Sequence, residues 1–167
     1  FYKWRYIMWN WKYLYEDKEL VCYCDIDNII NPEANEDGIY LSVDCYKSIP
    51  SKTATWIMYF IKNKETINRY IDYRRAAGLP IDGYEDFNNV ICLVELDAES
   101  YRYRVIPAGD FGKDGQELGA STIIADAKTS FLKGMKADWS TIVKGKTHKS
   151  VIALFRFIYG EGSPESA

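Results

Sequence analysis

The chain has 167 residues with 24 acidic and 21 basic side chains, which gives a net charge of −3. This length suits one domain that buries roughly 70% of its unfolded surface and needs no disulfide or metal to fold. Aromatic residues make up 16% of the chain, which excludes a disordered protein, and 11 Gly with 5 Pro exclude a collagen-like or linker sequence. No apolar run approaches the roughly 20 residues of a membrane-spanning helix.

The first third of the sequence predicts antiparallel strands. Residues 1–15 are almost all aromatic, β-branched or long, and residues 16–18 form a polar turn. Apolar side chains then alternate through 19–26, and again over 39–45 after a polar loop at 27–38. Such alternation predicts one apolar face on each strand.

The next segment, 53–61 (TATWIMYFI), is ambiguous. Its β-branched and aromatic content favours a strand, but it could also begin a long helix. Residues 64–77 predict a helix more clearly, and Gly-Leu-Pro at 78–80 supplies its stop signal. One stripe of this helix carries Ile67, Tyr70, Ile71 and Arg74.

The second half predicts a hairpin and then alternating elements. They are, in order, a hairpin of 90–96 and 101–106, a glycine-rich loop over 107–119 and a short strand over 122–125. Residues 129–144 predict an amphipathic helix from the spacing of their apolar residues, and 150–159 predicts a final apolar strand.

These elements predict an α+β fold with a mixed sheet and two main helices. A β-rich part with antiparallel strands, 1–50, precedes a core of the order αβββαβ over 64–159. We expect one domain over 1–160, followed by a polar tail over 161–167.

The cysteines predict free thiols. Cys22, Cys24, Cys45 and Cys92 form no C-x-x-C pair, and the single histidine, His148, leaves a zinc site short of ligands. We therefore expect buried free thiols and a cytoplasmic protein, because a reducing compartment keeps such thiols free.

Charge is distributed unevenly along the chain. Residues 16–44 contain nine acidic residues against one basic residue, whereas 128–156 contain seven basic residues against one acidic residue. The basic segment predicts a cationic face that holds phosphates, or else the two segments neutralise each other across the fold.

A pair of carboxylates marks the candidate catalytic site. Asp110 follows the second predicted strand of the core, and Asp126 ends the third. Carboxylates at two neighbouring strand ends can hold one Mg²⁺ between them. Lys128, two residues after Asp126, shares its face of the strand and could stabilise charge on a phosphate. The alternative is that Asp126 caps the next helix while Lys128 is solvated.

This arrangement of Asp110, Asp126 and Lys128, with Thr129 and Ser130 behind it, resembles the RecB-like branch of the PD-(D/E)xK nucleases. The resemblance covers about 64–159. It implies that Asp110 and Asp126 are metal ligands and that Lys128 is the catalytic lysine. It also implies a further acidic ligand, for which Glu65 and Glu95 are candidates.

The N-terminal strand suggests a second kind of site. Its odd positions are Phe1, Lys3, Arg5, Ile7, Trp9, Trp11, Tyr13 and Tyr15. If exposed, they form an aromatic and basic platform that stacks bases or anchors a protein partner. If buried, they are simply core, which the cost of an exposed aromatic surface favours.

The leading functional hypothesis is therefore a Mg²⁺-dependent phosphodiesterase, a nuclease-like hydrolase acting on nucleic acid. A run of basic residues would track the nucleic-acid backbone: Lys133, Lys136, Lys144, Lys146 and Lys149. The alternative is a non-catalytic protein-binding module, such as a small phage or bacterial inhibitor or immunity protein. It would bind through the aromatic strand or the acidic 16–44 region, and neither hypothesis involves a membrane.

Overall fold

The computed structural model describes residues 9–32, 40–41, 49–122 and 135–160. Within these ranges nine strands form one sheet with the main order β1-β2-β5-β6-β7-β8, and two helices accompany it. The predicted α+β class is confirmed. Every pairing between these strands is antiparallel, so the parallel strand of the predicted mixed sheet is not among the described elements.

The first strands lie close to their predicted positions. They are β1 (Trp11–Glu16), β2 (Leu20–Asp25), β3 (Ile29–Ile30), β4 (Tyr40–Leu41) and β5 (Lys52–Ile61). The ambiguous 53–61 segment is thus a strand, and the seven β-branched or aromatic residues among the ten of β5 explain why. β3 lies in the predicted loop, while 1–8, 33–39 and 42–48 lie outside the described residues.

The predicted first helix is confirmed as α1 (Lys64–Ala76). Asn63 caps its beginning, because its side chain accepts a hydrogen bond from the backbone N–H of Glu65. At its end the N–H of Leu79 donates to the carbonyl of Arg74, and Gly78 takes a left-handed φ of 72°.

The predicted hairpin is also confirmed, but it is longer. β6 (Phe87–Asp97) pairs with β7 (Arg102–Gly112), which continues through much of the predicted glycine-rich loop. A bulge beside Pro107 lets the strand continue past a residue that cannot donate to the ladder. A further strand, β8 (Glu117–Gly119), lies in the predicted loop, and all of the predicted strand 122–125 except Thr122 lies outside the described residues.

Two predictions near the C-terminus are wrong. Over the described part of 129–144 there is no helix, only an irregular path and β9 (Ser140–Thr141), which pairs with β7. Residues 150–159 belong to α2 (Lys149–Tyr159) and not to a strand. The side chains of Val151, Leu154, Phe155 and Ile158 are buried, and their spacing defines one helical face. His148 caps this helix by accepting from the N–H of Ser150.

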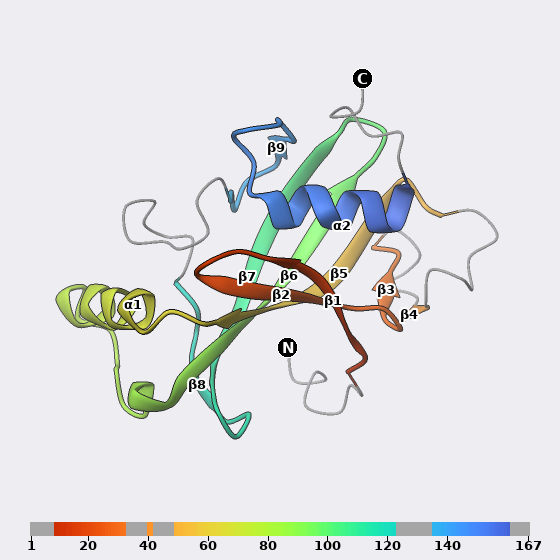
Figure 1. The fold of residues 1–167 in the computed structure, drawn as a ribbon. Helices are drawn as coiled ribbons and strands as arrows, with labels where there is room; N and C mark the ends of the chain where they lie inside the picture. Colours follow the sequence, from red (N-terminus) through yellow and green to blue (C-terminus); the bar gives the residue numbers. More distant parts are fainter. Residues whose placement is uncertain (1–8, 33–39, 42–48, 123–134, 161–167) are drawn as a thin grey trace.

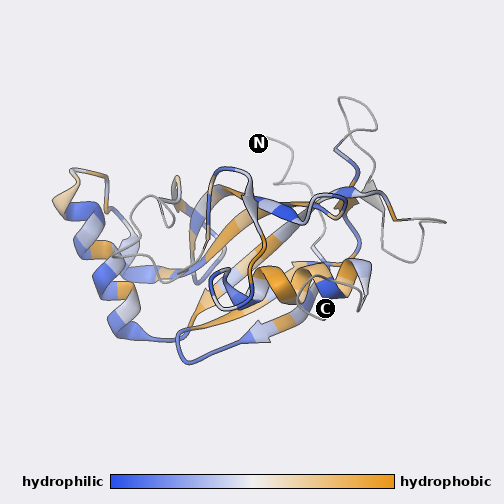
Figure 2. Cartoon of the chain, turned by 90° about the horizontal axis from the view of Figure 1, so that it is seen from above, coloured by the Kyte–Doolittle hydropathy of each residue, from blue (hydrophilic) through white to orange (hydrophobic). Residues whose placement is uncertain are grey.

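The helix α2 covers one face of the sheet. It lies across β5, β6 and β7, whereas α1 lies beyond the end of these strands (Figure 1). The buried Tyr59 hydroxyl bonds to Ser150 at 2.8 Å, which fixes α2 to the centre of the sheet. Viewed by hydropathy, α2 is rich in apolar residues and α1 is largely hydrophilic (Figure 2).

The opposite face of the sheet carries a second set of side chains. Successive residues of a strand point to opposite faces of the sheet, and residues paired across strands point to the same face. Tyr59 and the residues paired with it, Cys22 and Val90, therefore face α2, and their neighbours along each strand face away. The outward residues include Tyr13, Tyr23, Trp56, Met58, Phe60, Ile91 and Phe111. This aromatic face and the strand end near α1 are where the candidate sites lie.

Candidate functional site

Asp110 is the one predicted metal ligand of β7, and it is completely buried. It lies opposite Val90, on the side of the sheet that faces the core. The hydroxyls of Tyr70 and Tyr84 each donate a hydrogen bond of 2.7 Å to its Oδ2. Tyr70 comes from α1 and Tyr84 from a short 3₁₀ helix, Tyr84–Asp86. Three distant elements therefore converge on this carboxylate.

Arg74 completes the group around Asp110. Its guanidinium lies 3.6 Å from Oδ2 of Asp110, and its side chain is 3% exposed. It also donates to the carbonyls of Pro80 and Ala120 and stacks 4.4 Å from the ring centre of Tyr84. A side chain at Gly119 would meet the Tyr84 hydroxyl at 2.9 Å, so glycine is needed for this close packing.

Burial dominates the electrostatics of this group. It raises the pKa of Asp110 to about 6, although the hydroxyls of Tyr70, Tyr84 and Ser121 and the charge of Arg74 act in the opposite direction. Burial and the Asp110 charge raise the pKa of Tyr70 to about 12, and they raise that of Tyr84 as well. Both tyrosines therefore stay protonated and act as hydrogen-bond donors. The arrangement ties α1 to the end of the sheet.

The remaining residues of the predicted metal site do not join Asp110 in the described structure. Asp126 and Lys128 lie outside the described residues. Glu95 pairs across the strands with Arg104, five residues from Val90 on β6, so it lies on the opposite face of the sheet from Asp110. Glu95 therefore cannot share a metal ion with Asp110. Within the described ranges no three His, Cys, Asp or Glu side chains gather into a metal-binding group.

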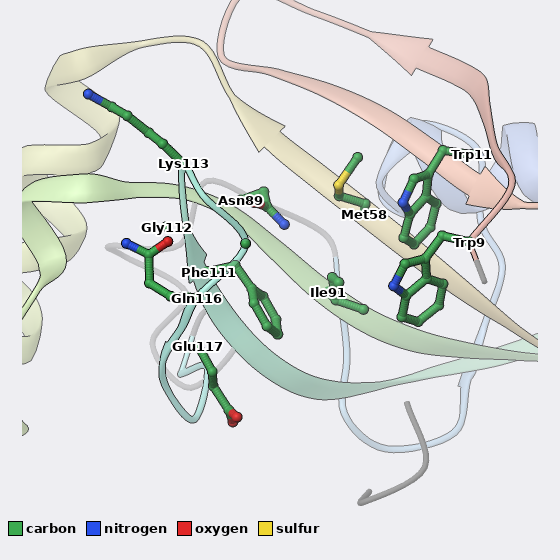
Figure 3. A pocket seen from close by; sticks show the side chains of 11 residues that line it. Trp9, Trp11, Met58, Asn89, Ile91, Phe111, Gly112, Lys113, Gln116 and Glu117 are labelled. Atoms are coloured by element: carbon green, nitrogen blue, oxygen red, sulfur yellow. The ribbon is translucent and has the colours of Figure 1, made fainter. Parts of the chain in front are cut away.

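A groove of about 550 Å³ crosses the aromatic face of the sheet. It is lined by Trp9, Trp11, Met58, Asn89, Ile91, Phe111, Gly112, Lys113, Gly115, Gln116 and Glu117. The two tryptophans stand on one side, the turn between β7 and β8 stands on the other, and Met58 and Ile91 lie between them (Figure 3). The groove is apolar at its centre and polar at its β8 end.

The tryptophans of this groove are held in place by other rings. Trp9 and Trp11 stack with their ring centres 4.8 Å apart, and Trp56 meets Trp9 edge-on at 6.0 Å. On the far side, Gly109 leaves room for the Phe111 ring, since a side chain there would lie 3.2 Å from it. The groove is thus shaped by packing and not by a single exposed residue.

The platform predicted for the N-terminal strand is present in part. Trp9 and Trp11 are half-buried and Tyr13 is 56% exposed, all on the aromatic face. Tyr15 differs, because a register shift after Tyr13 turns it to the other face, where it meets His148. The first four odd positions of the strand lie outside the described residues.

The predicted nucleic-acid-binding lysines separate into two groups. Lys144 and Lys149 line a hollow of about 290 Å³ beside α2. Lys136 and Lys146 are exposed but do not line this hollow, and Lys133 lies outside the described residues. The structure therefore brings two of the five lysines together.

The described acids of the 16–44 region are engaged in local contacts. Glu16 pairs with Lys62 at 2.7 Å, and Glu19 lies 3.7 Å from Arg69. Asp17 accepts hydrogen bonds from two backbone N–H groups of the β1–β2 turn, and Asp25 is buried. Glu16 and Asp27 remain exposed, and the other four acids of this region lie outside the described residues.

Sequence reasoning missed the partners of Asp110 and the far wall of the groove. One signal was present: Arg74 lies on the apolar stripe of α1, and a buried arginine needs an anion. Tyr84, Phe111 and Gln116 carry no such local signal, because their roles depend on tertiary contacts.

No described helix is long and apolar enough to cross a membrane. Comparisons with protein-family models, curated proteins and solved structures found no match for this chain. Its function must therefore be inferred from the geometry of its own residues.

Proposed function

We propose that this protein is a non-catalytic binding module and that its aromatic groove holds an extended segment of a protein partner. The observation that carries this proposal is the stacked pair Trp9–Trp11, which forms one wall of a groove of about 550 Å³. Tryptophan in a partly exposed hollow is typical of the residues that dominate protein–protein affinity. The face that bears the groove lies opposite the one covered by α2.

The lining of the groove suits a peptide better than an ion. Its apolar centre offers Met58, Ile91 and Phe111 to a partner's side chain, and its volume lies in the range that holds several such groups. Asn89 and Gln116 add amide groups that can bond to a peptide backbone. The rim also carries Lys113 and Glu117, which favours a partner without strong net charge.

Trp11→Ala is expected to weaken binding of a groove ligand by roughly thirtyfold, since a buried tryptophan hot spot contributes about 2 kcal/mol. Peptides would first be selected on the wild-type protein from a random phage-displayed library. Their affinities for each variant would then be measured by fluorescence anisotropy. Gln116→Ala, on the exposed turn, should weaken binding several-fold without disturbing the sheet.

Tyr13→Ala is the matched control, because Tyr13 is an exposed aromatic residue of the same face that does not line the groove. It should leave peptide affinity unchanged, and thermal melts should show that all variants fold. Two outcomes would contradict the proposal. One is that no peptide is enriched; the other is that enriched peptides bind the Trp11 and Gln116 variants as tightly as the wild type.

The phosphodiesterase hypothesis has one supporting observation. Oδ1 of the buried Asp110 has no hydrogen-bond partner among the described residues, so a ligand direction is open. Against it, Oδ2 already accepts two tyrosine hydroxyls, and Arg74 supplies a positive charge that disfavours a second cation. We therefore place this function second to the binding module.

Millimolar Mg²⁺ or Mn²⁺ is expected to leave the melting temperature of the wild-type protein unchanged, because nothing in the binding-module proposal involves a metal. A bound ion would stabilise the folded state by mass action. Melts of the wild type and of Asp110→Asn, with and without metal, test this. A metal-induced rise in the wild type that disappears in Asp110→Asn would support the phosphodiesterase instead.

The cysteines support a location in a reducing cytoplasm as part of this proposal. Cys22, Cys24 and Cys92 are free and buried in the core. Burial raises the pKa of all three thiols, so they remain protonated and unreactive. They behave as apolar core residues and require no oxidising compartment.

A further inference from the structure

A second hollow lies on the other side of the molecule, between α2, the turn that precedes it and β1. It has a volume of about 290 Å³, and three cationic side chains line it: Lys144, Lys149 and Arg156. Between them, Ile152, Ala153 and Tyr15 provide an apolar surface. Lys149, Ile152, Ala153 and Arg156 follow each other at helical spacing, so one side of α2 forms a wall of the hollow.

The three cations are not neutralised by the described part of the protein. No ion pair joins any of them to a described acid, whereas Lys62, Arg69, Arg75, Arg102 and Arg104 each form one. Asp17, in the turn that follows β1, accepts hydrogen bonds from the Tyr15 hydroxyl and from two backbone N–H groups. Among the described residues, therefore, no acid takes up the positive charge of the hollow through an ion pair, and this charge can attract a ligand.

The helix itself adds to this positive field. Lys149 is the first residue of α2, whose first turn contains no acidic residue. The N-terminal end of a helix carries a partial positive charge, so an acidic side chain is the usual complement there. A basic residue at this position raises the local potential further and favours an anion beside the helix.

We propose that this hollow binds an organic phosphate, with its charged head between the cations and an apolar or aromatic group on Ile152, Ala153 and Tyr15. A phosphate dianion matches several cations better than a single carboxylate does. The long stems of lysine and arginine allow residues two helical turns apart to reach one group. The site is independent of the aromatic groove.

A single small ligand fits the hollow better than a nucleic-acid strand. A strand would need a track of cations, yet Lys136 and Lys146 do not line the hollow. The apolar surface between the cations also matches a ligand with one phosphate and one ring. Sulfate or inorganic phosphate would use only the charged part and should bind more weakly.

Isothermal titration of the wild-type protein with phenyl phosphate is expected to show binding, and inorganic phosphate should bind more weakly. Lys149→Gln with Arg156→Gln should reduce the phenyl phosphate affinity by at least roughly tenfold, since hydrogen bonds between charged groups contribute about 1.5–3 kcal/mol each. Ala153→Trp should also abolish binding, because it fills the hollow while the charges remain. Lys149 and Arg156 are exposed, and Ala153 is partly buried.

The matched control is Lys136→Gln with Lys146→Gln, which removes the same number of charges outside the hollow. It should leave phenyl phosphate affinity unchanged at moderate salt. Equal losses in both double variants would show a diffuse charge effect and overturn the proposal. The proposal would also be overturned if neither phenyl phosphate nor inorganic phosphate bound. It would be overturned as well if an oligonucleotide bound tightly and both double variants, at Lys149 and Arg156 and at Lys136 and Lys146, weakened its binding.

Discussion

Arg74→Ala is expected to destabilise the folded protein by about 3–5 kcal/mol, because it leaves the buried Asp110 charge without its cationic partner. Arg74 is 3% exposed and lies 3.6 Å from a carboxylate that is fully buried. The exchange also strips the carbonyls of Pro80 and Ala120 of their donors and removes the stacking on Tyr84. Several losses thus act in the same direction.

Arg75→Ala provides the control for this measurement. Arg75 is the next residue of α1, it is 60% exposed, and its ion pair with Asp72 lies on the helix surface. Surface exchanges of this kind usually change stability by less than about 0.5 kcal/mol. Urea denaturation of both variants gives the comparison. Similar small losses for the two would mean that Arg74 and Asp110 do not form a buried pair.

A double-mutant cycle then separates the ion pair from the other losses. Arg74→Met keeps much of the side-chain volume, and Asp110→Asn keeps the acceptor for the tyrosine hydroxyls. The two exchanges together should cost less than the sum of their separate effects, because neither charge is left alone. Additive effects would contradict a direct interaction.

Local pattern was sufficient to predict the elements whose stabilising contacts are themselves local. The helix α1 follows from one stripe and a Gly-Leu-Pro stop, and the structure confirms it and adds the cap at Asn63. The hairpin of β6 and β7 follows from two strand-like runs on both sides of a polar turn. Its extension to Gly112 did not follow, because a bulge at Pro107 hides the strand in the sequence.

Composition misled the prediction where it was weighed above spacing. The sequence VIALFRFIY in α2 is rich in residues that favour strands, but its buried residues recur at three and four positions. The opposite error arose over 129–144, where apolar spacing predicted a helix. Met135 and Ile142 are buried from an irregular path instead, and Trp139 lies against Arg102 and Arg104.

The sequence analysis expected Asp110 to follow a strand, whereas it lies within β7, and it could not find what surrounds this residue. Its neighbours come from α1 and from the 3₁₀ helix, 26 to 40 residues away in the chain. A short motif cannot distinguish a carboxylate held by tyrosines from one that holds a metal, since both follow a strand. The groove could not be predicted for the same reason, because Trp11 and Gln116 line one groove only through the order of the strands in the sheet.

The stability of the protein is expected to rise as the pH falls through the titration of Asp110. Burial raises its pKa to about 6 in the folded protein, from an ordinary value of 3.8. A raised folded-state pKa means that the folded protein binds the proton more tightly than the unfolded chain does. The stabilisation that comes from protonated Asp110 is therefore complete below the pKa of this residue in the unfolded chain, and it is lost as the pH rises through about 6. Asp110 contributes about 3 kcal/mol to the free energy of unfolding over its full titration, and about 1 kcal/mol of this is gained when the pH is lowered from 7.5 to 5.

His148 opposes this effect in the same range. Burial lowers the pKa of its imidazole, so the folded protein holds it neutral and loses stability as the pH falls through the unfolded value near 6.5. The wild-type profile alone therefore mixes two contributions of opposite sign. His148→Asn removes the histidine term while it keeps a good cap for α2.

Asp110→Asn isolates the carboxyl group. The free energy of unfolding of the wild type, minus that of Asp110→Asn, should increase by about 1 kcal/mol when the pH is lowered from 7.5 to 5. The same difference measured in the His148→Asn background should change equally, because neither group is among the causes of the other's pKa shift. Urea denaturation at several pH values gives these differences directly. If the difference stays constant, the pKa of Asp110 is the same in the folded and unfolded states. If it decreases as the pH falls, the charged form of Asp110 is stabilised in the fold. Arg74 and the two tyrosines would in that case outweigh the cost of burial.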